Sequence, residues 1–316
     1  MPDLKLFRLS PTGPAELTAK AAQVEKSLQV LFEANLEGLL GVRLLASEYS
    51  TGKVHGGRID TLGLDENGCP VIIEYKRALN ENVINQGLFY LDWLLDHRKE
   101  FQWLVMEKLG ADAAKAVDWS APRLLCIAGD FTRYDEHAVK QINRSIELIR
   151  YRHYGDGLLL LELVNATQAT PAMAPGPRPP EPAAPAVALA EAGPVAGAVK
   201  GIAYRIARLS PPAADLYEAA RAHLLALGDD VQVKELMHYI AFKRLRNFCC
   251  LEAFPSHGTT VLYLKLNPDS VALEPGFTRD VRAVGHYGTG DVEVTLSSLD
   301  DLRKAEPLIQ RAYDGG

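Results

Sequence analysis

Residues 56–76 constrain the fold of this chain more than any other segment, because two β-branched apolar runs flank the dipeptide Asn67-Gly68. An Asn-Gly pair between two such runs is the strongest local signal for a tight β-hairpin. The predicted strands carry Asp60, Glu74 and Lys76. A strand interior rarely holds such charges unless they are paired or bind a ligand. The segment therefore predicts a hairpin that carries a polar site.

The length of the turn decides whether the two acids meet. Glu74 and Lys76 are two residues apart, so their side chains leave the same face of the strand. A three-residue loop over 66–68, with Gly68 in a left-handed bulge position, places Asp60 directly opposite Glu74. A loop of two or four residues would send the two acids to opposite faces. We predict the odd-length loop, with carboxyl oxygens within about 5 Å of each other and able to share one divalent cation.

Five segments within residues 24–95 follow an ordered pattern around this hairpin. The hairpin reads D-x13-E-x-K, and the segments are V-E-K-S-L, S-E-Y, G-G-R-I-D, I-I-E-Y-K-R and N-Q-G-L-F-Y. The pattern resembles the PD-(D/E)xK nuclease superfamily and, more narrowly, the nuclease domain of the EndoMS/NucS family. Asp60 follows Ile59 where the signature has proline, which is a common variation. The resemblance implies a restriction-endonuclease-like α/β core: a helix, a three-stranded antiparallel meander, a helix and a further strand.

The resemblance also implies an activity, that of a metal-dependent DNA endonuclease acting in repair or in defence against foreign DNA. Mg²⁺ or Mn²⁺ would be held by four oxygen ligands: Asp60, Glu74, the Tyr75 carbonyl and Glu25 of the first helix. Lys76 would orient the attacking water and offset charge in the transition state, and Gln86 would complete the catalytic set. Glu33 is a rival to Glu25. Glu48 is either a further acid near the metal or the partner of Arg58.

The net charge of −6 means that contact with DNA must come from a local patch. The candidates for backbone contacts are Arg58, Arg77, Tyr90, Arg144, Arg150 and Arg152. A solvated face is the alternative for the three arginines over 144–152, and packing of the helix onto the sheet is the alternative for Gln86 and Tyr90. DNA is the expected partner, and a second copy of the chain is the other candidate.

The composition indicates in which cellular compartment the protein is expected. The four cysteines lack metal-ligand spacing, which is typical of a reduced, cytoplasmic protein. The start of the chain does not read as a secretory signal, and an apolar run long enough to cross a membrane is absent from the sequence.

A change of composition divides the chain. Residues 166–200 hold eight of the 19 prolines and many alanines, so they predict a flexible linker. The predicted domains are therefore a nuclease-like domain over 1–165 and a small α+β domain over 201–316, which would bind nucleic acid or a partner. Within them, apolar spacing predicts helices over 14–37, 134–147 and 233–242, and alternation predicts a strand over 281–287.

Two other functions fit the same residues. One is a non-catalytic nucleic-acid-binding or adaptor protein that keeps the nuclease fold, although an intact Asp60, Glu74 and Lys76 set argues against it. The other is an RNA-directed hydrolase, because the pattern of residues does not distinguish RNA from DNA.

Overall fold

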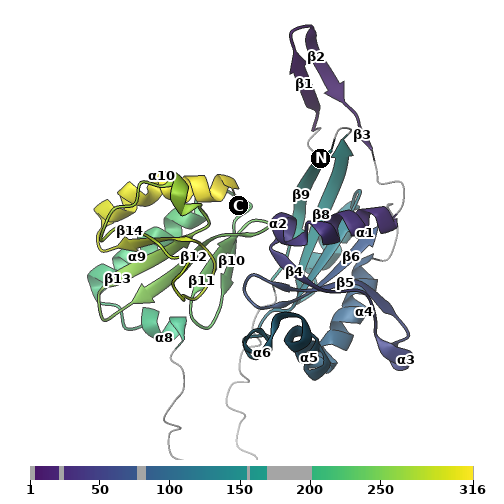
Figure 1. Cartoon of the computed structure of the whole chain (residues 1–316), viewed down its shortest axis with the longest axis horizontal. Helices are drawn as coiled ribbons and strands as arrows, with labels where there is room; N and C mark the ends of the chain where they lie inside the picture. Colours follow the sequence, from purple (N-terminus) through teal and green to yellow (C-terminus); the bar gives the residue numbers. More distant parts are fainter. Residues whose placement is uncertain (1–3, 21–24, 77–82, 155–156, 169–200, 316) are drawn as a thin grey trace, which may run out of the picture.

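The computed structural model describes residues 4–20, 25–76, 83–154, 157–168 and 201–315. They form two sheets, each with its own helices, and a separate two-stranded hairpin near the N-terminus (Figure 1). The expected linker lies outside the described residues from position 169 onward, as do Arg77 and the side chain of Glu25. Within the described ranges, no helix has both the length and the apolar character needed to cross a membrane.

The first sheet is mixed, with strand order β3-β8-β7-β6-β5-β4 and with β9 also paired to β8. Its strands are β3 (Ala19–Lys20), β4 (Val42–Ser50), β5 (Arg58–Asp65), β6 (Pro70–Lys76), β7 (Arg123–Ala128), β8 (Ser145–Tyr154) and β9 (Leu158–Ala166). The antiparallel meander predicted from the sequence is confirmed in β4, β5 and β6. β6, β7 and β8 then run parallel to one another.

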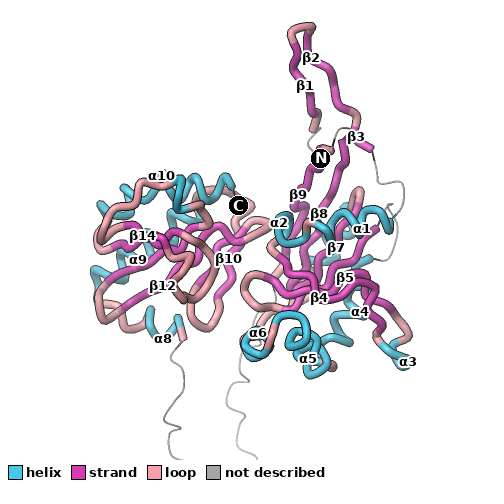
Figure 2. Tube along the Cα trace, viewed as in Figure 1, coloured by secondary structure: helices cyan, strands magenta, loops and turns pink. Residues whose placement is uncertain are grey.

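Helices cover both faces of this sheet (Figure 2). On one face, α4 (Val83–Asp96) and α5 (Arg98–Leu109) pack against Leu62 and Ile72. On the other face, α1 (Glu25–Ala34) and α2 (Leu36–Leu40) pack against Val71 and Ile73. Three short helices lie in the connections: α3 (Gly52–His55), α6 (Ala111–Lys115) and α7 (Arg133–Lys140). Because side chains alternate along a strand, Glu74 belongs with Ile72 to the α4 face.

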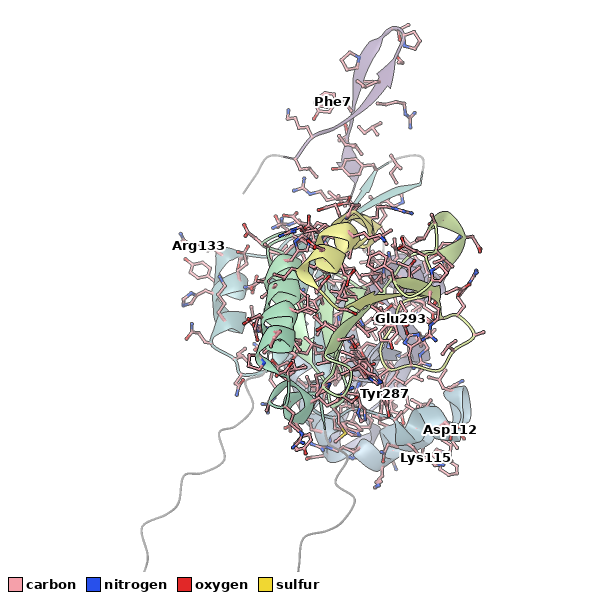
Figure 3. All side chains as sticks on the ribbon, turned by 90° about the vertical axis from the view of Figure 1, so that its left-hand side faces the viewer. Phe7, Asp112, Lys115, Arg133, Tyr287 and Glu293 are labelled. Carbon is pink, nitrogen blue, oxygen red and sulfur yellow. The ribbon has the colours of Figure 1, made fainter. Side chains whose placement is uncertain are left out.

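Two of the predicted helices are partly wrong. Within the helix predicted over 14–37, the described residues up to 20 are not helical, because the chain reverses at 11–12 and β2 (Gly13–Leu17) pairs with β1 (Leu6–Ser10); the described helical residues start with α1 at Glu25. That hairpin projects from the body of the molecule and carries the exposed Phe7 (Figure 3). The helix predicted over 134–147 ends at Lys140, and the residues from 145 onward form β8, whose first seven residues are all buried. A continuous buried run is typical of a central strand.

The second domain is an antiparallel sheet in the order β10-β11-β12-β13-β15-β14. Its strands are β10 (Gln232–Glu235), β11 (Ile240–Lys243), β12 (Asn247–Phe254), β13 (Thr259–Leu264), β14 (Thr278–Asp280) and β15 (Val292–Leu296). One face packs against α9 (Pro211–Leu225) and α10 (Leu299–Gly315), with α8 (Ile202–Ile206) beside them and a 3-10 turn at Pro268–Ser270.

Two predictions for this domain are wrong. Residues 233–242 are a hairpin and not a helix, because Leu236 and Tyr239 close a two-residue turn between β10 and β11. Residues 281–287 are not a strand, because Val281 donates to the Asp291 carbonyl and the glycine-rich segment between them forms turns.

The two domains meet at the turn of the predicted hairpin. The Asn67 side chain accepts hydrogen bonds from Asn247 (2.7 Å) and from the Tyr239 hydroxyl (3.0 Å). Glu66 accepts a bond from the Asn247 backbone and pairs with Lys265. The second domain is therefore packed against the end of β5 and β6 in addition to being linked through the chain.

Candidate active site

The hairpin has the three-residue turn that the sequence predicts. Leu64 lies opposite Pro70, and the Asp65 amide donates to the Cys69 carbonyl over 2.9 Å. Gly68 adopts φ +76°, a left-handed conformation that is strained for residues with a side chain. The predicted loop over 66–68 and its bulge position are therefore confirmed.

This turn brings Asp60 and Glu74 together on the α4 face. The ladder between β5 and β6 ends with the pair Thr61 and Ile73, so the next residues in register are Asp60 and Glu74. Beyond that pair, β5 and β6 are joined by hydrogen bonds from the backbone of one strand to the side chain of the other. The Asp60 amide donates to Glu74 Oε1 (3.2 Å), and the Tyr75 amide donates to Asp60 Oδ2 (3.1 Å). Each carboxylate thus accepts a bond from the backbone of the opposite strand, which fixes both side chains where the strands separate.

Glu74 is held in an unfavourable environment for a carboxylate. Its side chain is fully buried, and burial together with the neighbouring Asp60 charge raises its pKa to about 9. Among the described residues, Glu74 Oε2 finds no hydrogen-bond partner. Because a buried oxygen acceptor without a donor costs roughly 1–3 kcal/mol, this atom points to a missing partner such as a cation.

Lys76 and Tyr75 complete the site from β6. Lys76 is half-buried on the same face as Glu74, and its charge lowers the pKa of Glu74 against the stronger effect of burial. The N–H and C=O of one strand residue leave on the same side, so we expect the Tyr75 carbonyl to face the Asp60 side, as its amide does.

The acids on and near the first helix are arranged differently from one another. Glu33 faces the opposite side of the sheet, where it accepts bonds from the Thr61 hydroxyl (2.6 Å) and from Gln29 (2.9 Å). Glu48 pairs with Arg58 and with Lys26, and its charge still contributes to the raised pKa of Glu74. The structure therefore favours the pairing alternative for Glu48. The position of the Glu25 carboxylate stays a prediction.

Gln29 was not anticipated as a site residue. Its buried amide donates to the Asp60 carbonyl (2.7 Å) and to the Ser47 hydroxyl (3.1 Å), so it ties α1 to β5, the middle strand of the meander, and to β4. The only signal in the sequence is a glutamine directly after the apolar Leu28, which is too common a pattern to identify it.

Described residues in this region fit a divalent cation in part. Within the described ranges, no three His, Cys, Asp or Glu side chains gather into a metal-binding group. Asp60 and Glu74 supply two carboxylates, and the partnerless Glu74 Oε2 is a hard oxygen donor of the kind that Mg²⁺ and Mn²⁺ prefer. A third ligand would have to come from the Tyr75 carbonyl or from Glu25.

Gln86 and Tyr90 share one face of α4, as predicted, because Gln86 Nε2 lies 3.4 Å from the Tyr90 hydroxyl. Tyr90 is buried, and its hydroxyl accepts a bond from the Arg58 amide. A side chain on Gly57 would collide with the Tyr90 ring, since an added Cβ would lie 2.5 Å from it. These contacts favour the packing alternative for Tyr90, whereas the half-buried Gln86 remains next to the site.

The described arginines that were predicted to contact DNA differ in how far their side chains are exposed. The Arg58 side chain is 68% exposed at the edge of the site, and Arg144 is exposed on the loop that leads directly into β8. The Arg150 side chain is 4% exposed and bonds Asp130 (2.7 Å) and Glu162 (2.8 Å), so it is not accessible to a DNA backbone. Arg152 is half-buried on the same face of β8. The expectation for Arg150 fails because those two acids follow β7 and lie on β9, beyond the reach of a local pattern.

Comparisons with known proteins match part of the chain to a family model and nearly all of it to a bacterial relative. Residues 205–315 match the model described as a domain of unknown function, DUF5655. The chain is 27% identical over 318 residues to a Haemophilus influenzae protein named "Uncharacterized protein", which covers 98% of this chain and 99% of that protein.

Two solved structures show limited similarity at 16% identity. The first is a repair endonuclease from Pyrococcus abyssi, with a TM-score of 0.23 over 42% of this chain and 50% of the other. The second is an EndoMS complex with double-stranded DNA, with a TM-score of 0.24 over 48% of this chain and 66% of the other. The chain thus aligns with less than two thirds of either protein.

Proposed function

We propose that the chain is a metal-dependent phosphodiesterase that cleaves DNA internally. The observation that carries this proposal is the pairing of Asp60 with Glu74 at the end of β5 and β6, with one buried carboxylate oxygen left without a described partner. A purely structural acid pair would be expected to have its buried oxygens satisfied.

The residues divide the work of hydrolysis. Asp60, Glu74 and the Tyr75 carbonyl would hold Mg²⁺ or Mn²⁺, with Glu25 as the fourth ligand. When bound, the ion would supply polarisation of the scissile phosphate and a lower pKa for an attacking water. The Lys76 ammonium would donate a hydrogen bond to that water and offset negative charge in the transition state. Arg58 would hold a neighbouring phosphate by charge, without reading sequence.

Cleavage of plasmid DNA by the full chain tests this proposal. We expect nicking in Mn²⁺ or Mg²⁺, loss of activity in EDTA, and loss of at least about a hundredfold in Glu74→Gln and Asp60→Asn, since either change deletes a metal ligand at nearly constant volume. Glu107→Gln, an exposed acid on α5, is the matched control and should cut normally.

The substrate panel should include single-stranded DNA, branched DNA and RNA. Faster cleavage of RNA than of DNA would replace the DNA assignment by the RNA-directed hydrolase. Wild-type rates in Glu74→Gln would refute the site itself.

A further inference from the structure

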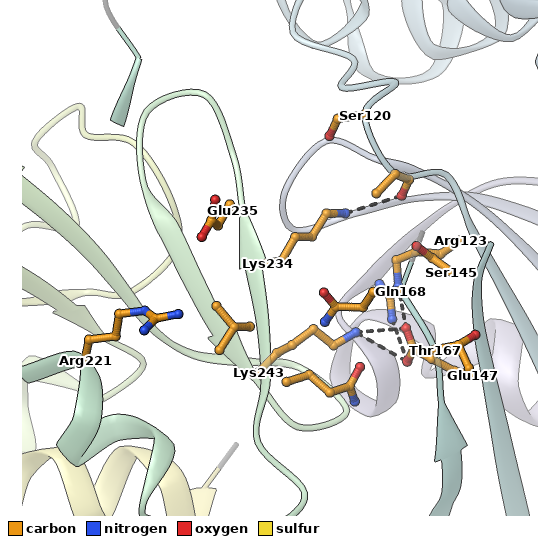
Figure 4. Close-up of a pocket in the computed structure, with 13 residues that line it drawn as sticks. Ser120, Arg123, Ser145, Glu147, Thr167, Gln168, Arg221, Lys234, Glu235 and Lys243 are labelled. Atoms are coloured by element: carbon orange, nitrogen blue, oxygen red, sulfur yellow. Dashed lines mark hydrogen bonds and ion pairs between the residues drawn. The ribbon is translucent and has the colours of Figure 1, made fainter. Parts of the chain in front are cut away.

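A cavity of about 340 Å³ lies between the two domains (Figure 4). Val71, near the start of β6, pairs with the lining residue Arg123, so the cavity lies at the opposite end of β6 from Glu74. Lys234 of β10 and Lys243 of β11 reach into it from the second domain, and Arg123 and Glu147 line it from the first (Figure 4). Its volume falls within the range of about 300–1,000 Å³ that is typical of small-molecule sites, which often lie at domain interfaces.

Five buried charges connect the domains along this cavity. Arg123 bonds Glu147 (2.8 Å) and Asp65 (2.9 Å) within the first domain. Lys243 donates to Glu147 (3.1 Å) across the interface. Lys234 lies 3.8 Å from the Asp65 carboxylate and donates to the Cys69 sulfur. All of these charged side chains are at most one tenth exposed.

The buried set contains more positive than negative charge. It has three cations and two carboxylates, and the further acid near Cys69, Asp118, is only half-buried, so solvent partly screens its charge. The remaining charged residues that line the cavity are Arg221 and Glu235, which cancel one another. An excess charge in a buried site costs several kcal/mol unless a counter-ion or a lost proton removes it. Burial and the nearby Arg123 charge lower the pKa of Lys243 to about 8, which agrees with this excess.

The rest of the lining suits an oxyanion. Hydroxyl and amide side chains surround the cations, namely Ser120, Ser145, Thr167, Gln168 and Gln232. Arginine and lysine together with hydroxyl donors are the groups that bind phosphate oxygens in proteins. We propose that this cavity binds a phosphate-bearing small molecule, from inorganic phosphate up to the size of a mononucleotide. The proposal is independent of nuclease activity, because Glu74 lies three residues, or about 10 Å, along β6 from Val71, which pairs with the lining residue Arg123.

Titration calorimetry of the full chain in EDTA tests the proposal, with inorganic phosphate and AMP as separate ligands. EDTA removes divalent ions, so phosphate cannot bind through the candidate active site. We expect saturable binding of at least one ligand. Tighter binding of AMP would assign a nucleotide-like ligand, and equal binding would assign the phosphate group alone. Absence of binding of either ligand at 10 mM, roughly the upper limit for a weak site, overturns the proposal.

Variants localise the binding. Lys243→Met should weaken it at least about tenfold, because one charge-assisted hydrogen bond is lost. Lys265→Met is the matched control, since Lys265 also pairs across the interface but lies outside the cavity. Glu74→Gln should leave affinity unchanged. Arg221→Gln, at the partly exposed rim, should weaken binding about threefold. If Lys243→Met does not fold, Arg221→Gln is the variant that tests whether the ligand binds in this cavity. Wild-type affinity in both cavity variants would overturn the assignment.

Discussion

Replacing Glu74 by glutamine should stabilise the metal-free protein, although it should abolish cleavage. In the folded chain the Glu74 carboxyl keeps its proton up to a pKa of about 9, whereas in the unfolded chain it ionises near the ordinary value of 4.5. The folded state therefore binds one more proton between these values, and wild-type stability falls as pH rises through that window. The loss is about 1.4 kcal/mol per pH unit, or about 3 kcal/mol at pH 7 and about 6 kcal/mol at pH 9.

Glutamine does not titrate, so the free energy of unfolding of the variant should exceed that of the wild type by about 3 kcal/mol at pH 7 and about 6 kcal/mol at pH 9. The assay is urea unfolding in EDTA at pH 5, 7 and 9, followed by tryptophan fluorescence. The three tryptophans, at positions 93, 103 and 119, all lie in the first domain, so the signal reports on the domain that holds Glu74. Glu107→Gln, which replaces an exposed acid on α5 in the same domain, is the control for the effect of the substitution itself.

Addition of Mn²⁺ reverses the comparison. A cation bound by Asp60 and Glu74 favours the ionised carboxylates, so it should raise the stability of the wild type and leave Glu74→Gln nearly unchanged. A stability difference between variant and wild type that is the same at pH 5 and pH 9 would refute the claim that Glu74 is protonated in the folded, metal-free chain.

Three further results are expected. Limited proteolysis within 169–200 should give two fragments that still co-elute in size-exclusion chromatography, because buried ion pairs join the domains. Fragments that separate at micromolar concentration would contradict this. Glu147→Gln should lower the free energy of unfolding in urea by about 3–5 kcal/mol, because it increases the excess of buried positive charge. Lys243→Met should lower it clearly less, because it removes that excess. Equal losses of stability in the two variants would argue against the excess. Arg150→Met should lower the free energy of unfolding by about 1–3 kcal/mol, because it breaks a buried ion pair, and should leave the salt dependence of DNA binding unchanged. If the DNA affinity of this variant depends less steeply on salt concentration than that of the wild type, Arg150 contacts DNA after all.

Local signals were sufficient for the hairpin. Asn67-Gly68, the β-branched runs and the two-residue spacing of Glu74 and Lys76 all act over a few positions, and together they predict the turn, the shared face and the position of Asp60. The segment over 233–242 shows the opposite case. Its apolar residues fit a helical spacing, but Val233 and Ile240 pack on one face of the second sheet and Leu236 on the other. Pairing with strands that are distant in the sequence makes residues 233–242 a hairpin, and the spacing of apolar residues within the segment does not encode that pairing.

The contacts between domains had no sequence signal for a further reason. Asp65, Arg123, Glu147, Lys234 and Lys243 come from five separate strands or strand ends, and each alone reads as an ordinary surface charge. Only the packing of one domain on the other removes them from water. A net charge or a motif search over a single segment cannot identify such a group.

The turn over residues 66–68 has a consequence for how this chain can vary. Hairpin tips are normally the places where proteins accept extra residues, fusion tags or deletions. Here a single inserted residue would turn Asp60 away from Glu74 and would also withdraw Asn67 from Asn247. Changes of length at this tip would therefore damage two distant properties in one step. The projecting tip at residues 11–12, between β1 and β2, is the better place for a label or a fusion.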